Sequence, residues 1–109
     1  MKITFILINQ YSDIRKYFVK GEEVMEYMIA VFRARTETIN FANILRSYGV
    51  NVMIISTPRQ INVSCGISVR FNSAYLEKAK EILSRRKFDS FGGIYHARQM
   101  GGRMVIVPV

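Results

Sequence analysis

The residue of this chain that is best suited to chemistry is its single cysteine, Cys65, which closes the segment of residues 57–66 together with Gly66. A lone cysteine forms no intramolecular disulfide, and one thiol falls short of the ligand set of a structural zinc site. If Cys65 does chemistry, it therefore acts as a single nucleophilic or carrier sulfur. Arg59 would favour its thiolate form, and Gly66 would let another molecule approach the backbone.

The alternative is that Cys65 is simply a small residue of the core. Alternate residues of the following run share one face, which consists of Cys65, Ile67, Val69 and Phe71. This pattern favours a thiol packed as a small hydrophobe. Cys65 is, however, the first residue of that predicted strand, at the rim of the sheet. The preceding loop of about ten residues is also longer than a tight hairpin needs, and long ordered loops are often kept for binding. Both interpretations stay open at this point.

Other groups offer weaker candidates for chemistry. His96 is the only histidine, so we expect no metal site. It would serve as a base for Cys65 only if the fold joined them, and its place near a strand end favours a surface or interface role. Basic side chains form a candidate anion site, made of Arg59, Arg70 and the cluster Arg85-Arg86-Lys87. For the cluster, the alternative is a solvated helix end. We take Arg59, Ser64, Gly66 and Arg70 as the predicted binding residues around the carrier thiol.

Composition bounds the class of protein. The chain has 109 residues, half of them apolar, which predicts one domain with a modest core. One cysteine and the absence of a plausible signal peptide favour a reducing, cytoplasmic setting, and no stretch is long enough to span a membrane. The net charge of +8 predicts attraction to nucleic acid, anionic ligands or acidic proteins. No glycine-rich phosphate loop is present, and we expect no cofactor.

The hydrophobic pattern predicts an α+β protein. Residues 25–32 are apolar on both alternating faces, as in a central strand covered on both sides. The expected elements are a strand over 25–32, a helix capped by Thr36 and ending before Gly49, strands over 51–56 and 65–71, a helix capped by Asn72 or Ser73, and a strand over 92–95. This order is the ferredoxin-like β-α-β-β-α-β motif, with two helices on one face of the sheet. We expect the first and third strands to be central and parallel.

The two ends of the chain fall outside this plan. We divide the chain into an N-terminal extension (1–24), a ferredoxin-like core domain (25–98) and a C-terminal strand-like tail (99–109). Each end contains an apolar, strand-like run. Because an open apolar sheet face is unusual in a soluble monomer, we expect the helix-free face to be covered by these terminal segments or by a second subunit in a homodimer.

The cysteine segment resembles a known family. The resemblance rests on Thr57-Pro58-Arg59-Gln60, then Ser64-Cys65-Gly66-Ile67, then a basic residue and Phe71. These features are similar to those of small bacterial proteins described as putative selenium/sulfur carrier protein-like, over about residues 25–98. The resemblance implies that Cys65 holds a chalcogen, as a persulfide or selenosulfide, and exchanges it with donor and acceptor proteins. It favours a carrier over an autonomous enzyme.

Two other classes of function compete with the carrier. The first is a basic binding module for nucleic acid or an anionic ligand, for which Tyr11, Tyr17 and Tyr95 are the candidate stacking side chains. No recognition helix or RNA-binding sheet motif accompanies them, so we expect any nucleic-acid association to be weak and electrostatic. The second is a structural or regulatory subunit in which Cys65 is core. We expect no association with membranes.

Overall fold

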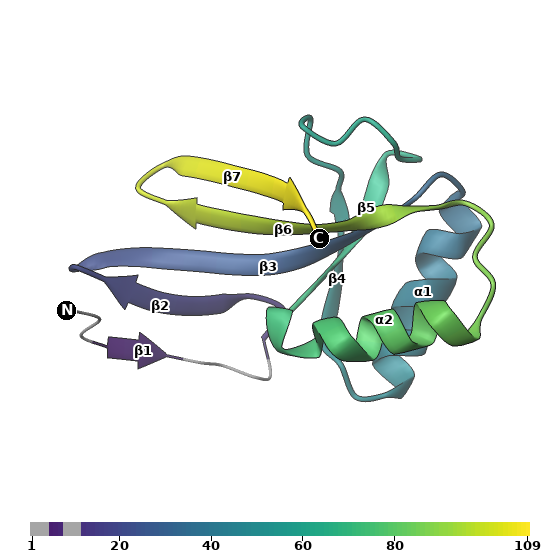
Figure 1. Ribbon diagram of the computed structural model, residues 1–109, viewed down its shortest axis with the longest axis horizontal. Helices are drawn as coiled ribbons and strands as arrows, with labels where there is room; N and C mark the ends of the chain where they lie inside the picture. The colour runs from purple at the N-terminus through teal and green to yellow at the C-terminus, as the bar shows by residue number, and fades with distance from the viewer. Residues whose placement is uncertain (1–4, 8–11) are drawn as a thin grey trace.

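The computed structural model of the chain describes residues 5–7 and 12–109, and within them seven strands form one antiparallel sheet that carries two helices (Figure 1). In chain order the elements are β1 (Phe5–Leu7), β2 (Arg15–Val19), β3 (Glu22–Phe32), α1 (Arg35–Ser47), β4 (Val52–Ser56), β5 (Ile67–Phe71), the 3-10 turn η1 (Ser73–Tyr75), α2 (Leu76–Arg85), β6 (Phe91–Met100) and β7 (Arg103–Pro108). The predicted α+β class is confirmed. Of the N-terminal strand predicted from the apolar run, residues 1–4 and 8–11 lie outside the described residues.

The centre of the sheet is β3, as the doubly apolar pattern of residues 25–32 predicts. On one side β3 pairs with β6 from Val24 to Phe32. On its other side, its first half pairs with β2 and its second half with β5. Strands β1, β4 and β7 flank β2, β5 and β6 respectively. This position buries β3 from residue 27 to residue 32.

The strand directions correct one expectation. The first and third strands of the predicted motif, β3 and β5, are neighbours, but they run antiparallel. Helix α1 returns the chain so that β4 runs in the direction of β3, and β5 then reverses as the antiparallel partner of β4. The strand order of the whole sheet also differs from that of a four-stranded ferredoxin-like sheet. Its path is β1-β2-β3-β5-β4, and β6 pairs with β3 off this path and carries β7 on its other side. Strands β1, β2 and β7 enlarge the sheet.

The helix starts follow the predicted caps only in part. Asn72 Oδ1 accepts a hydrogen bond from the backbone nitrogen of Ala74 at 2.9 Å, so it caps the 3-10 turn η1, whereas α2 itself begins at Leu76 with Tyr75 at its cap position. Thr36, in contrast, was predicted as the cap of α1, but it lies inside the helix, and Ala34 occupies the cap position. No side chain caps α1, and Ser90 Oγ instead accepts a hydrogen bond from the backbone nitrogen of the cap residue, Ala34, at 3.0 Å. A tertiary contact has overridden a local signal.

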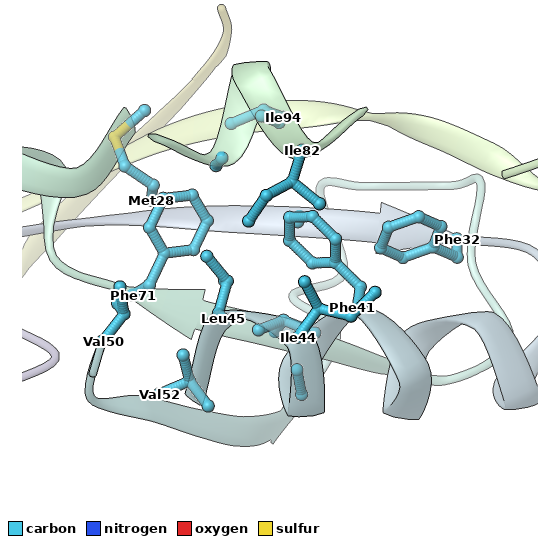
Figure 2. Close-up of a cluster of buried hydrophobic side chains, with 14 residues drawn as sticks. Met28, Phe32, Phe41, Ile44, Leu45, Val50, Val52, Phe71, Ile82 and Ile94 are labelled. Carbon is cyan, nitrogen blue, oxygen red and sulfur yellow. The ribbon is translucent and has the colours of Figure 1, made fainter. Parts of the chain in front are cut away.

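The main core lies between the helices and the sheet. Figure 2 shows Met28 and Phe32 of β3 facing Phe41 and Leu45 of α1, with Ile82 of α2 closing the cluster. The ring centroids of Phe32 and Phe41 are 5.2 Å apart, within the range of favourable aromatic pairs. This core fixes the start of α1 against the end of β3, which is where the cysteine lies.

A second apolar cluster covers the helix-free face of the sheet. Tyr27, Ile29 and Val31 are buried there beneath Ile61, a residue of the loop between β4 and β5. Ile14, Met104 and Ile106 from the terminal segments pack against the same cluster. The expectation that terminal segments help to cover this face is therefore confirmed, although the contribution of Ile61 was not foreseen. The cysteine loop is thereby anchored across the sheet.

Candidate functional site

The cysteine loop, residues 57–66, is ordered by a set of short hydrogen bonds. Its two ends are joined where the backbone nitrogen of Thr57 donates to the carbonyl of Gly66 at 3.0 Å. The hydroxyl of Thr57 lies 2.6 Å from that of Ser64 and 2.6 Å from that of Ser68 in β5. Ser64 Oγ also accepts from the backbone nitrogen of Gly66 at 2.9 Å. Ser64 and Gly66, the two neighbours of Cys65, are therefore both held by hydrogen bonds within the loop.

The sulfur of Cys65 lies against the first turn of α1. The backbone nitrogen of Cys65 donates to the carbonyl of Phe32 at 3.2 Å. Its Sγ lies 3.5 Å from Thr38 Oγ1 and 3.6 Å from the carbonyl oxygen of Ile67. The residue is partly exposed, so it is neither sealed in the core nor fully solvated. Gly66 adopts a φ of +105°, which ends the extended backbone, so β5 begins two residues after Cys65 rather than at it.

The surroundings of Cys65 lower the pKa of its thiol. Burial is the largest single influence and acts in the opposite direction, because it disfavours the charged thiolate. The hydrogen bond of Thr38, backbone groups of Ile67 and Cys65, and the positive charge of Arg35 together outweigh it. The pKa of Cys65 therefore lies below its ordinary value, which is typical of a thiol beside a helix N-terminus and a cation.

Thr38 and Arg35 are the two site residues that sequence reasoning missed. Thr38 is fully buried and stands in the apolar stripe of α1, three and four residues before Phe41 and Ala42. A hydroxyl at a buried helical position was the available signal, since such a group needs a partner. Its hydroxyl lies within donating distance of two acceptors, the carbonyl oxygen of Ala34 at 3.1 Å and the sulfur at 3.5 Å, and donation of its single proton to the sulfur favours the thiolate. Nothing in the local sequence of Arg35 marks its proximity to the thiol.

The structure distributes the predicted binding residues over two sides of the sheet. Ser64 and Gly66 adjoin the thiol, and Arg59 is exposed on the same loop. Arg70 projects from the helix-free side, where its guanidinium pairs with Asp13 and lies 5.2 Å from the ring centroid of Tyr27. The thiol, in contrast, contacts α1. Arg70 is thus already engaged in structural contacts.

His96 is not brought to Cys65. It lies opposite Met28 in the register of β3 and β6, and its Nε2 is 3.3 Å from Glu26 Oε2. Phe32, which binds the backbone of Cys65, is four residues further along β3, a separation of about 13 Å in a strand. The sequence-based preference for a surface role over a catalytic one agrees with this placement.

The remaining candidates show no further site among the described residues. Arg85, Arg86 and Lys87 are exposed at the end of α2, where Arg85 pairs with Glu81. Of the tyrosines considered for stacking, Tyr17 and Tyr95 are half-buried, and Tyr11 lies outside the described residues. In the described part of the chain, no group of three or more potential protein ligands is arranged to hold a metal ion. None of its helices has the length and apolar character needed to cross a membrane.

Comparison with known proteins gives one match. A family model described as putative Se/S carrier protein-like matches residues 27–95, well over half of the chain. The matched interval contains both helices and the whole loop of residues 57–66. It also contains Arg35, Thr38 and Ile67, which surround the sulfur. No curated protein and no solved structure matches the chain.

Proposed function

The chain belongs to the putative Se/S carrier protein-like family, and from this premise we propose that Cys65 carries a chalcogen, as a persulfide or selenosulfide, for transfer to a partner enzyme. The observation that supports the proposal best is the environment of the thiol. Cys65 is partly exposed, and Thr38 and Arg35 help to hold its pKa below the ordinary value. A core cysteine needs neither property.

The transfer requires no redox cofactor. In loading, the Cys65 thiolate attacks the outer sulfur of a donor persulfide. A new S–S bond forms at Cys65, the donor's S–S bond breaks, and the donor leaves as a thiolate. In unloading, an acceptor thiolate attacks the outer sulfur and Cys65 leaves with the electron pair of the broken bond. A selenium atom follows the same sequence through a selenosulfide.

The loop supplies features that suit such an exchange. Gly66 is exposed, and a Cβ at this position would meet no atom within 4 Å, so a partner backbone has room to approach. Three exposed arginines border this end of the molecule, namely Arg33 and Arg35 at the turn into α1 and Arg59 on the loop. We propose that they attract acidic donor and acceptor proteins, and that Arg59 contacts a negatively charged group of the persulfide donor.

We extend the proposal to the architecture and setting of the protein. The unit formed by β3, α1, β4, β5, α2 and β6 is proposed as a ferredoxin-like core, corresponding to residues 25–98, with residues 1–24 as an extension and 99–109 as a tail. The family membership and the single reactive thiol support a cytoplasmic, reducing setting. A homodimer stays a prediction. Among the described residues β7 pairs only with β6, so its outer edge is one surface that a second subunit could meet.

Loading of Cys65 is tested directly by intact-mass spectrometry. Folded protein is incubated with glutathione persulfide, and we expect a mass gain of one sulfur atom that dithiothreitol removes. The Cys65→Ser variant should show the same folded spectrum and no gain. A Ser84→Ala variant, altered at an exposed serine of α2, serves as the matched control and should load normally. A native protein that gains no sulfur, but whose thiol is alkylated after denaturation, would identify Cys65 as core packing.

A further inference from the structure

The sheet extends beyond its helices as an arm made of β2, β3, β6 and β7 (Figure 1). On the helix side of this arm, β6 and β7 place three pairs of residues directly opposite one another. These pairs are His96 with Val107, Arg98 with Val105, and Met100 with Arg103. The same six side chains line a groove of about 350 Å³.

The groove is apolar because the helix layer ends before it. Its floor continues the face that buries Met28 and Ile94 under α1 and α2, but no described helix covers this part of the arm. As a result, Val105 and Val107 keep 51% and 45% of their surface exposed. Two neighbouring exposed valines in a concave surface are a larger apolar area than isolated surface residues provide.

The charged side chains that line the groove are arginines. Arg98 and Arg103 are exposed, and among the described residues neither makes an ion pair. Two carboxylates lie beside the lining residues: Glu22, whose Oε1 would be 3.9 Å from a Cβ at Gly101, and Glu26, which lies opposite Arg98 and is already occupied. The oxygens of Glu26 contact Arg15 at 3.3 Å, the hydroxyl of Tyr17 at 3.2 Å and His96 at 3.3 Å. Two guanidinium groups are therefore left to face the solvent above an apolar floor.

We propose that this groove binds a small amphipathic organic anion. Its apolar chain or ring lies on Val105 and Val107, and its carboxylate, sulfonate or phosphate group pairs with Arg98 and Arg103. The volume is within the range of small-molecule sites, and guanidinium groups bind such oxyanions through paired hydrogen bonds. His96, fixed by Glu26, closes the end of the groove nearest the helices.

Two features favour a small soluble anion over other anionic partners. The lining contains no Phe, Tyr or Trp side chain, and its one aromatic ring, the imidazole of His96, is held by Glu26, so it offers little platform on which nucleic-acid bases could stack. It is also a concavity of limited volume, whereas a lipid surface needs a broad convex apolar face. The groove is separate from the carrier thiol, because Glu26, which lies opposite Arg98, is six residues, or about 20 Å, along β3 from Phe32.

The probe for the test is octanoate, titrated into isotopically labelled full-length protein and followed by amide chemical shifts. We expect shifts concentrated in residues 96–107. The Arg98→Gln/Arg103→Gln variant should weaken the apparent affinity about tenfold, the loss expected from one or two charge-assisted hydrogen bonds. Arg86→Gln, at the exposed end of α2, is the single-charge control and should bind normally, as should Cys65→Ser.

Three outcomes would overturn the proposal. The first is an equal effect of octanoate and of octyltrimethylammonium, which would show that charge plays no part. The second is shifts spread over the surface and weakened equally by Arg86→Gln. The third is that residues 96–107 respond only to anionic phospholipid vesicles or only to a single-stranded oligonucleotide. None of these results bears on the chalcogen loading of Cys65, so the two proposals fail independently.

Discussion

The acidity of Cys65 depends on groups from α1 that are distant in sequence. The hydroxyl of Thr38 is 27 positions away and meets the sulfur only because Phe32 and α1 are packed against the loop. Arg35 adds a positive charge from the first turn of the same helix. The residue that sequence reasoning placed in this role, Arg59, is exposed on the loop. The two arginines can be separated by experiment.

The first prediction concerns the pH dependence of alkylation. Because the folded environment lowers the pKa of Cys65, its reaction rate with iodoacetamide should reach half its maximum at a pH below about 8.5, the value for a free cysteine. Thr38→Val keeps the size and burial of the side chain but removes the hydroxyl. The midpoint should then rise, because desolvation is less fully opposed, and the rate at neutral pH should fall several-fold. An unchanged midpoint in Thr38→Val would exclude the hydroxyl as the cause.

The second prediction separates the two arginines. Arg35→Gln should raise the alkylation midpoint and slow the reaction at neutral pH about twofold, a modest effect because the side chain is exposed and its field is screened. We expect Arg59→Gln to alter the midpoint less, but to slow loading from an anionic persulfide donor. The sequence alone assigns the stabilisation of the thiolate to Arg59. A larger midpoint shift in Arg59→Gln than in Arg35→Gln would restore that assignment.

At the scale of elements, the cysteine loop is held by its own apolar anchor. Ile61 is only 6% exposed and covers Tyr27, Ile29 and Val31 on the face opposite the helices. At the other end of the loop, Thr57 bridges Ser64 and Ser68. The loop therefore closes the second core and positions the thiol at the same time. Its stability and its chemistry should be coupled.

The third prediction tests this coupling. Ile61→Ala should lower the free energy of unfolding by about 2–4 kcal/mol, the usual cost of emptying a buried aliphatic site. The alkylation midpoint of Cys65 should move towards that of a free thiol, because the loop loses its anchor. Asn62→Ala, at the exposed neighbouring position, is the matched control and should change stability by less than about 0.5 kcal/mol. Urea unfolding and alkylation give the two readouts. A destabilised Ile61→Ala protein with an unchanged midpoint would separate anchoring from reactivity.

Sequence periodicity predicted the elements better than their relations. The doubly apolar run of β3 predicts a central strand because only burial on both faces favours that pattern. Gly49, with φ +81°, ends α1 as a local rule requires. The predicted start of α1 at Thr36 is misplaced because the chain is fixed two residues earlier, where Ala34 at the cap position binds Ser90, 56 positions away. The contact of Thr38 with Cys65 was missed for the same reason. Local rules contain no information about which distant groups meet.

At the scale of the whole molecule, the positive charge is spread over separate regions of the surface. Arg33 and Arg35 lie near the thiol, Arg98 and Arg103 on the arm, and Arg86 at the end of α2. Such a distribution provides a general attraction for anions, and these arginines of the described residues lie in separate regions rather than in one row. The thiol and the arm groove are about 20 Å apart along β3, so a ligand in the groove does not obstruct a partner at Cys65.

The fourth prediction follows from this distribution. A single-stranded oligonucleotide should bind weakly at low salt, driven by the net charge of +8, and should dissociate as the salt approaches physiological concentration, because counterion release is then less favourable. Stacking should add little. The hydroxyl of Tyr17 is bound to Glu26, and Tyr95 packs against the second core, so neither ring is a free platform. Fluorescence anisotropy over a salt series measures the slope. A sequence-selective complex that persists near physiological salt would instead make nucleic-acid recognition the leading function, because electrostatic attraction alone does not distinguish sequences.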